Sequence, residues 1–209
     1  LTMNDFKDPP PAWRSVPFWS LNDDLSPAGI DRQLVAFKEG GFGGSYLHSR
    51  IGLLTEYLGK DWWTAMDAGV EASKKLGIEA WFYDEDKWPS GFAGGIVPLM
   101  SEDYHARYIV RLAKSDAVPP LSELLNEDEQ YRYYSCKAKM GNAWFNGTCW
   151  VDLMNPATVK AFIDSSYAPY AERYRKEIGT SVHGIFTDEP QISPRNEFRN
   201  LGSIPYSPL

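Results

Sequence analysis

The sequence predicts an α/β fold: a (β/α)8 barrel of the TIM type, of which this chain supplies about the first four βα units. Short apolar runs alternate with segments of helical periodicity, as parallel strands joined by helices do. Polar or charged residues follow each predicted strand, and the active site of a barrel lies at such strand ends. No glycine-rich phosphate loop follows a strand, which disfavours the alternative, a doubly wound nucleotide-binding sheet.

The first βα unit begins with a short apolar strand over residues 16–20, which leads into the polar residue Asn22. Ser26 and Pro27 predict the start of a helix, because serine caps helices and proline suits the first helical turn. Gly40, followed by a second glycine, is expected to end this helix.

The second unit begins with a strand over residues 42–48, which brings His48 and Arg50 to its C-terminal end. The next helix has Asp61 as its expected N-cap and ends at Gly77. Polar side chains therefore follow the second strand as they follow the first.

The third strand, 78–83, runs directly into the loop 84–91, which is too charged to belong to a core. The fourth strand covers residues 182–186 and is followed by Asp188 and Glu189. Acidic residues thus follow the third and the fourth predicted strands directly or within two residues.

Between the third and fourth strands the pattern changes over about residues 102–150. Two stretches, 108–112 and 131–135, predict antiparallel strands separated by a proline-rich and acidic segment. We interpret 102–150 as an inserted β-rich excursion within one chain-long unit, the N-terminal part of a barrel catalytic domain. Helical spacing resumes after Asn155, with a kink expected at Pro169.

Composition limits the partners that the chain can have. It contains 21 basic and 28 acidic residues, and the net charge of −7 disfavours nucleic acid and an anionic membrane surface. Aromatic residues make up 14% of the chain, and rings that are not needed in the core can stack on sugars. No apolar run has transmembrane length, so we expect a soluble protein, either cytoplasmic or secreted with its leader removed. A neutral carbohydrate is the substrate that fits best.

Glu189 is the candidate catalytic acid. Cleavage of a glycosidic bond needs one carboxylic acid to protonate the leaving oxygen and a second carboxylate to act as nucleophile or to activate water. Partial burial behind an apolar strand and the like charge of Asp188 can raise the pKa of the Glu189 carboxyl group. The alternative is a loop carboxylate that caps a helix or pairs with an arginine.

Three like charges crowd into one turn of the 84–91 loop, which is costly unless a cation or sugar hydroxyls compensate. A solvated acidic loop with Lys87 as partner is the alternative, and a structural histidine is the alternative for His48. The aromatic residues nearby favour a ligand pocket. We therefore predict substrate contacts from residues at or near the strand ends: Trp19, Asn22, His48, Arg50, Asp84, Glu85, Asp86, Trp88 and Asp188.

Several segments together are similar to one known family. They are residues 6–11, 16–20, 41–44, 48–53, 83–91 and 186–190. They resemble the α-L-rhamnosidases of glycoside hydrolase family 106 over nearly the whole chain, and the tyrosine-to-glycine acidic loop is the most specific of them. The resemblance implies a (β/α)8 catalytic domain, inversion at the anomeric carbon, a calcium ion at the active site and Glu189 as the general acid. It assigns no metal ligand in this sequence.

The predicted function is therefore that of a glycoside hydrolase that releases a terminal deoxyhexose such as L-rhamnose. The catalytic base would lie on a later strand, so the remainder of the barrel is expected downstream, and this piece alone should be inactive. One alternative is a non-catalytic carbohydrate-binding barrel, and another is a relative that acts on a different glycoside. A third, a sugar isomerase-like metal barrel, has only His48 as a candidate ligand.

Overall fold

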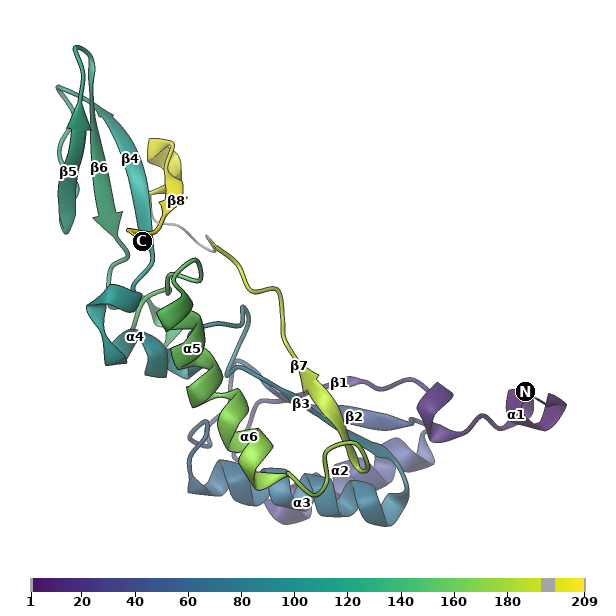
Figure 1. Cartoon of the computed structure of the whole chain (residues 1–209). Helices are drawn as coiled ribbons and strands as arrows, with labels where there is room; N and C mark the ends of the chain where they lie inside the picture. The colour runs from purple at the N-terminus through teal and green to yellow at the C-terminus, as the bar shows by residue number, and fades with distance from the viewer. Residues whose placement is uncertain (1, 193–197, 209) are drawn as a thin grey trace. The chain divides into compact units, whose positions relative to one another are not determined.

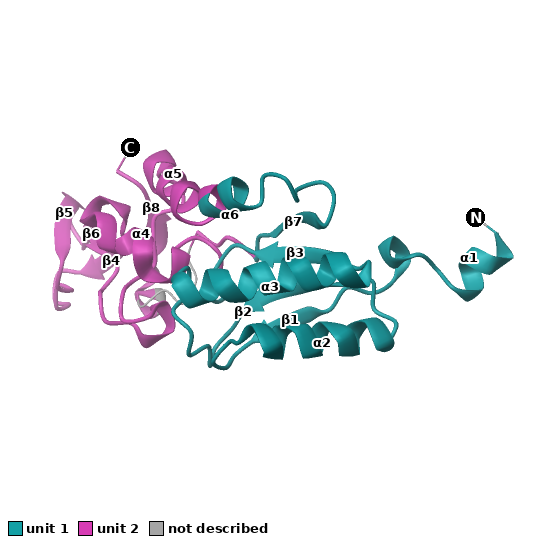
Figure 2. Cartoon of the chain, turned by 90° about the horizontal axis from the view of Figure 1, so that it is seen from below, with its two compact units in different colours: residues 1–88, 169–188 teal, residues 89–168, 189–209 magenta. Residues whose placement is uncertain are grey.

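The computed structural model describes residues 2–192 and 198–208, and the chain forms two compact units. Unit 1 comprises residues 1–88 and 169–188, and unit 2 comprises residues 89–168 and 189–209 (Figures 1 and 2). Each unit has a four-stranded sheet and a hydrophobic core of its own. All four strands predicted for the barrel lie in unit 1.

Unit 1 is built on a parallel sheet. Its strands are β1 (Phe18–Leu21), β2 (Gly44–Ser49), β3 (Glu79–Tyr83) and β7 (Val182–Phe186). They stand in the order β1-β2-β3-β7, and every neighbouring pair is parallel. Within this unit each strand therefore lies beside the one that precedes it in the chain.

Three helices accompany these strands. They are α2 (Pro27–Glu39), α3 (Lys60–Leu76) and α6 (Tyr167–Arg173), whose first two residues belong to unit 2. Ser26 caps α2 as predicted, because its side chain accepts a hydrogen bond from the Gly29 backbone N–H. Gly77 ends α3 with a φ of 63°, a left-handed conformation that glycine adopts without steric cost.

The core of unit 1 lies between these helices and one face of the sheet, with α2 and α3 on the same side (Figures 1 and 2). Leu47 of β2 is fully buried, and a side chain on Gly69 of α3 would meet it at 2.7 Å. Phe82 of β3, which pairs with Leu47, contacts the Tyr170 ring of α6 with centroids 4.6 Å apart. Burying each such side chain contributes roughly 1.5–3 kcal/mol to stability.

The opposite face of the parallel sheet carries a group of aromatic rings. Phe18 stacks on Tyr46 with centroids 4.5 Å apart, and Phe186 meets Phe18 edge-on at 4.8 Å. The Tyr46 ring also contacts Trp81 at 5.3 Å. Phe18 is 46% exposed, whereas Leu47 on the helix-covered face is fully buried, so the aromatic face is the more accessible of the two at this point.

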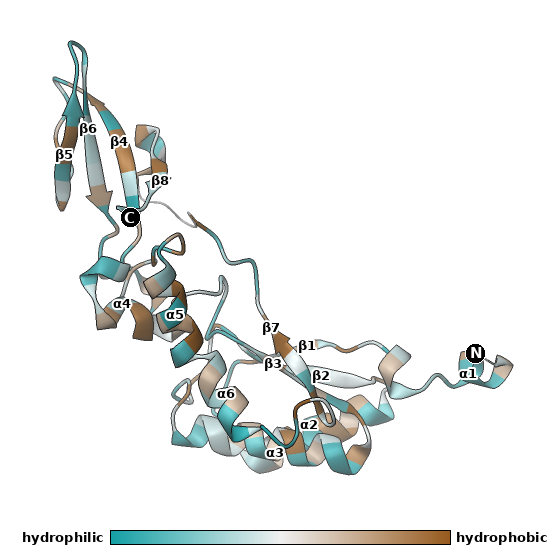
Figure 3. Cartoon of the chain, viewed as in Figure 1, coloured by the Kyte–Doolittle hydropathy of each residue, from teal (hydrophilic) through white to brown (hydrophobic). Residues whose placement is uncertain are grey.

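Unit 2 contains an antiparallel sheet in the order β5-β6-β4-β8. Its elements are β4 (Arg107–Ala113), β5 (Ser122–Glu127), β6 (Tyr131–Lys137), β8 (Ile204–Tyr206), α4 (Ile96–Met100) and α5 (Pro156–Ser165). Along β4 the buried residues Tyr108, Val110 and Leu112 alternate with more exposed ones, the pattern of a strand with one covered face. Hydrophobic residues of α5, visible in Figure 3, join the same core.

The other described elements are short. They are α1 (Met3–Lys7) and the 3-10 helices η1 (Pro11–Trp13), η2 (Ala93–Gly95), η3 (Glu102–Tyr104), η4 (Ala143–Phe145) and η5 (Arg199–Leu201).

The α/β class predicted from the sequence is confirmed, whereas two local predictions are wrong. Gly59 rather than Asp61 is the N-cap of α3; Asp61 lies in the first turn, where a carboxylate favours the helix dipole. The helix is interrupted at Ser166, in the turn before Pro169, because a proline ring clashes with the carbonyl four residues before it. The acidic segment between the two predicted antiparallel strands itself forms β5. No helix in the described part of the chain is long and apolar enough to cross a membrane.

Candidate functional site

The carboxyl ends of the four parallel strands meet at one edge of the unit 1 sheet. Because all four strands are parallel and each is paired with its neighbour, this edge gathers polar side chains from distant parts of the sequence. We call it the strand-end site and define it by residues 22, 48–50, 83–86 and 188.

Tyr83 and Asp188 form the most direct link between two strands at this site. The Tyr83 hydroxyl donates a hydrogen bond to Asp188 Oδ2 at 2.8 Å. Tyr83 is fully buried, and its ring centroid lies 3.9 Å from that of His48. Burial first, and then the hydrogen bond to Asp188, raise the pKa of the Tyr83 hydroxyl well above its usual value. The phenol therefore stays protonated and remains a donor at neutral pH.

The acidic loop after β3 is buried. Asp84, Glu85 and Asp86 are 0%, 0% and 7% exposed. The Ser49 hydroxyl donates to Asp86 Oδ1 at 2.9 Å, and the Asp86 backbone N–H donates to Glu85 Oε1 at 2.9 Å. Lys87 Nζ lies 3.8 Å from Asp86 Oδ2, at the outer limit of an ion pair. Burial on this scale excludes the solvated acidic loop that the sequence left as an alternative.

His48 is a buried histidine, 4% exposed, whose two ring nitrogens have no hydrogen-bond partner among the described residues. The Phe18 ring meets it edge-on with centroids 5.4 Å apart. Burial, together with the charge of Arg50, lowers the pKa of His48 to about 4. The imidazole is therefore neutral at pH 7 and presents one donor and one acceptor. The neutral imidazole can form hydrogen bonds with a ligand hydroxyl, but it lacks the positive charge that would attract a ligand carboxylate.

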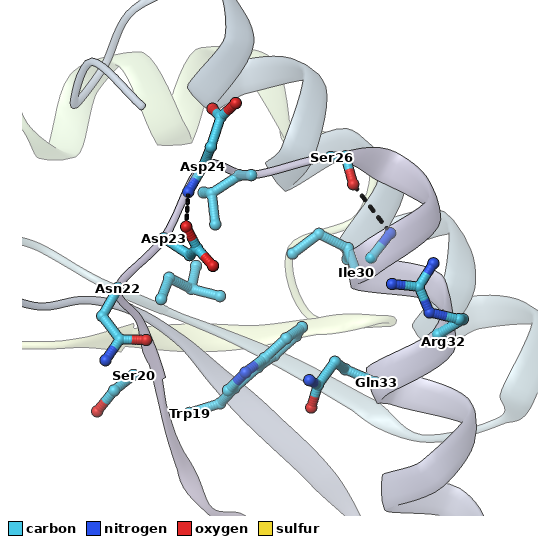
Figure 4. Close-up of a pocket in the computed structure, with 12 residues that line it drawn as sticks. Trp19, Ser20, Asn22, Asp23, Asp24, Ser26, Ile30, Arg32 and Gln33 are labelled. Atoms are coloured by element: carbon cyan, nitrogen blue, oxygen red, sulfur yellow. Dashed lines mark hydrogen bonds between the residues drawn. The ribbon is translucent and has the colours of Figure 1, made fainter. Parts of the chain in front are cut away.

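Trp19 lies on the other face of the sheet from His48. It pairs with Leu47 on the helix-covered face, and its ring meets Phe37 of α2 edge-on at 5.3 Å. Trp19 lines a pocket of about 280 Å³ formed by β1 and the start of α2, where its ring lies beside Gln33 (Figure 4). The role predicted for Trp19 in substrate binding stays a prediction.

Three further predicted contacts lie close to the strand ends. Asn22 is exposed and lines the same pocket as Trp19 (Figure 4). The Arg50 backbone N–H donates to the Leu21 carbonyl at 3.2 Å, which carries the β1–β2 pairing to the edge of the sheet. Trp88 is half-buried and lies within the 84–91 loop, two residues after Asp86. Their roles in substrate binding also stay predictions.

Glu189 is exposed, so the partial burial expected from the sequence is wrong. The physical reason is that β7 already ends at Phe186, and the chain leaves the sheet before it reaches Glu189. Its φ of 45° falls in a region that residues other than glycine rarely adopt. Such backbone conformations persist where the surrounding structure holds them, and they cluster at active sites. The role of general acid stays a prediction.

Ser49 and Tyr83 were not among the residues predicted for the site. Each is the last residue of its strand, β2 and β3 respectively. The strand-end position was therefore the signal that could have identified both.

The family resemblance implies a calcium ion at the active site, and it assigns no ligand for that ion in this sequence. Among the described residues, no group of three or more histidine, cysteine or acidic side chains is arranged to hold a metal ion. Calcium takes about six to eight oxygen ligands. The calcium ion stays a prediction.

The strand-end site combines buried carboxylates, a phenol donor and a neutral imidazole with aromatic rings on the same face of the sheet. Carboxylates and neutral donors of this kind can orient the hydroxyl groups of a polar, uncharged ligand. Neither the protein-family models nor the curated proteins searched give a match to this chain.

Proposed function

We propose that the protein is a glycoside hydrolase whose sugar site lies at the strand-end site. The observation that carries the proposal is the presence of carboxylates after two adjacent parallel strands: the buried acidic loop after β3, and Asp188 with Glu189 after β7. Acid–base cleavage of a glycosidic bond requires a pair of carboxyl groups, and this chain would supply the acid of that pair. Glu189 would protonate the leaving oxygen, and a second carboxylate would activate water.

A (β/α)8 barrel is the fold that we propose for the parallel sheet. Its strand order follows the chain, and residues of α2, α3 and α6 share a single core on one sheet face. Doubly wound sheets carry helices on both faces, so this arrangement supports the barrel. The aromatic face with Phe18 and Tyr46 would then line the barrel interior. The remaining strands and the catalytic base would come from further sequence.

A neutral terminal sugar is the substrate class that these groups favour. The His48 imidazole is neutral at pH 7, so it adds no positive charge that would attract an anionic sugar. A deoxyhexose such as L-rhamnose combines hydroxyl groups with an apolar methyl group, and aromatic rings suit the methyl group. The sequence resemblance to α-L-rhamnosidases supports the same choice.

The test is the Glu189→Gln variant of the full-length protein, assayed on two rhamnosides that differ in leaving group. Nitrophenolate departs without protonation, whereas an alkyl alcohol needs an acid. We expect a loss of about 10²- to 10⁴-fold in kcat/KM on methyl α-L-rhamnoside and a much smaller loss on the 4-nitrophenyl compound. The matched control is Glu129→Gln, an exposed carboxylate in the turn between β5 and β6, which should leave both rates unchanged.

Equal losses on the two substrates would remove Glu189 from the role of acid, and an unchanged rate would remove it from the mechanism. Sugar binding by calorimetry without sugar release from the wild-type protein would instead support a non-catalytic carbohydrate-binding barrel. The half-exposed aromatic face around Phe18 is the observation that favours this second candidate.

A further inference from the structure

Tyr83 is held in place from both neighbouring strands. Its ring contacts His48 of β2 at 3.9 Å and stacks on Phe186 of β7 with centroids 6.4 Å apart and planes 10° apart. The ring is fully buried. Packing on both sides therefore fixes the direction in which the phenolic hydroxyl points.

That hydroxyl extends the contact between β3 and β7 beyond the end of their ladder. The last paired residues are Tyr83 and Phe186, followed by one backbone bond from the Asp84 N–H to the Phe186 carbonyl at 3.1 Å. The 2.8 Å bond from Tyr83 to Asp188 reaches two residues further along the chain. It restrains a segment that no longer has strand partners in the ladder.

Glu189 follows the restrained residue directly, with its unusual φ of 45°. A rare backbone conformation persists only where neighbouring contacts hold it. We propose that Tyr83 is a positioning residue, which anchors Asp188 and thereby fixes the backbone from which Glu189 projects. This inference rests on the proposed function, in which Glu189 is the acid.

The chain offers a matched control in the same unit. Tyr174 is also buried, 3% exposed, and its hydroxyl donates to Asp67 Oδ1 at 2.9 Å. This second tyrosine–aspartate bond lies among the helices, where Tyr174 contacts Phe82 on the helix-covered face. Removing its hydroxyl deletes a bond of the same kind away from the strand-end site.

The experiment compares Tyr83→Phe and Tyr174→Phe in the full-length protein on methyl α-L-rhamnoside. Tyr83→Phe keeps the ring and its packing, so we expect a folded enzyme with kcat lower by about 10-fold or more and KM changed less than about twofold, because orientation controls the chemical step. Tyr174→Phe should lower the melting temperature to a similar extent and leave kcat unchanged.

A double-mutant cycle tests whether Tyr83 acts through Asp188. In an Asp188→Ala background, Tyr83→Phe should have no further effect on kcat. If Tyr83→Phe is poorly folded, the comparison moves to Asp188→Asn, which can still accept the hydrogen bond and should retain more activity than Asp188→Ala.

A wild-type kcat in Tyr83→Phe, or an undiminished effect of Tyr83→Phe in the Asp188→Ala background, would overturn the positioning role. The proposed function would still be supported in that case if Glu189→Gln lost more kcat/KM on methyl α-L-rhamnoside than on the 4-nitrophenyl compound. A full-length protein that cleaves no glycoside would overturn both.

Discussion

Each of the two units buries one histidine, and the two histidines differ in how their ring nitrogens are satisfied. His105 of unit 2 is 5% exposed, and its Nε2 lies 2.8 Å from the Pro98 carbonyl oxygen. His48 of unit 1 is 4% exposed, and neither of its nitrogens has a partner within the described residues. Because buried polar groups are normally hydrogen-bonded, His105 is explained by the fold and His48 is not.

The buried carboxylates of the two units differ in which part of the chain supplies their hydrogen bonds. Asp152 of unit 2 is 3% exposed, and its Oδ1 accepts a bond from the Met154 backbone N–H at 3.0 Å, a local turn of two residues, whereas its Oδ2 has no partner among the described residues. In unit 1 the buried acidic loop is tied to another strand through Ser49 and Asp86. Burial alone therefore does not identify a functional group in this chain. It is more informative to ask whether the buried group has a hydrogen-bond partner and which part of the chain supplies that partner.

The largest expected effect that tests the difference between His48 and His105 is the pH dependence of the free energy of unfolding. The pKa of His48 is lowered from 6.5 to about 4 by folding, so below pH 6.5 the unfolded chain binds a proton that the folded chain does not. Stability should therefore fall as the pH falls from 6.5 to 4, by up to about 3 kcal/mol from this residue. Urea denaturation across this pH range should show a steeper loss for the wild-type protein than for His48→Phe.

Other groups titrate in the same range, and the variant is the control for them, since they are common to both proteins. Parallel curves for the wild-type protein and His48→Phe would mean that His48 takes up its proton in the folded state as readily as in the unfolded chain. His48 would then have a solvent or protein partner, and its contrast with His105 would disappear.

The strands and helices of unit 1 could be predicted from the sequence because their signals are local. Ser26 with Pro27 and the left-handed Gly77 mark helix ends through contacts within a few residues. The apolar runs mark strands that are buried whatever their neighbours are. Strand β5 was missed because its residues are almost all exposed, so no alternation distinguishes it from a loop.

The site could be predicted only in part, because its contacts depend on register. That polar residues follow the strands is visible in the sequence, and the parallel sheet brings His48 and the acidic loop to one edge. The bond from Tyr83 to Asp188 joins residues 105 positions apart and follows from the pairing of β3 with β7. The face on which Trp19 lies is also set by register, since a shift of one residue reverses it.

A smaller effect, and the most direct comparison of the two units, comes from the same substitution at both histidines at pH 7.5. His105→Phe removes the donor that faces the Pro98 carbonyl, which should lower the free energy of unfolding by about 1–3 kcal/mol. His48→Phe removes two nitrogens without partners and should leave stability unchanged or raise it. Hydrogen–deuterium exchange should then speed up in β4 and β6 for His105→Phe and stay unchanged in β2 and β3 for His48→Phe.

Each variant serves as the control for the other, because the residue replaced, the residue introduced and the depth of burial are the same. A loss of equal size at both positions would show that His48 has a structural partner and would weaken its place in the strand-end site. If only His105→Phe lowers the free energy of unfolding and only His48→Phe weakens sugar binding, the His48 ring nitrogens of unit 1 form hydrogen bonds with the ligand rather than with the fold. Stability and binding would then be separated at two residues of one type, which burial alone does not distinguish.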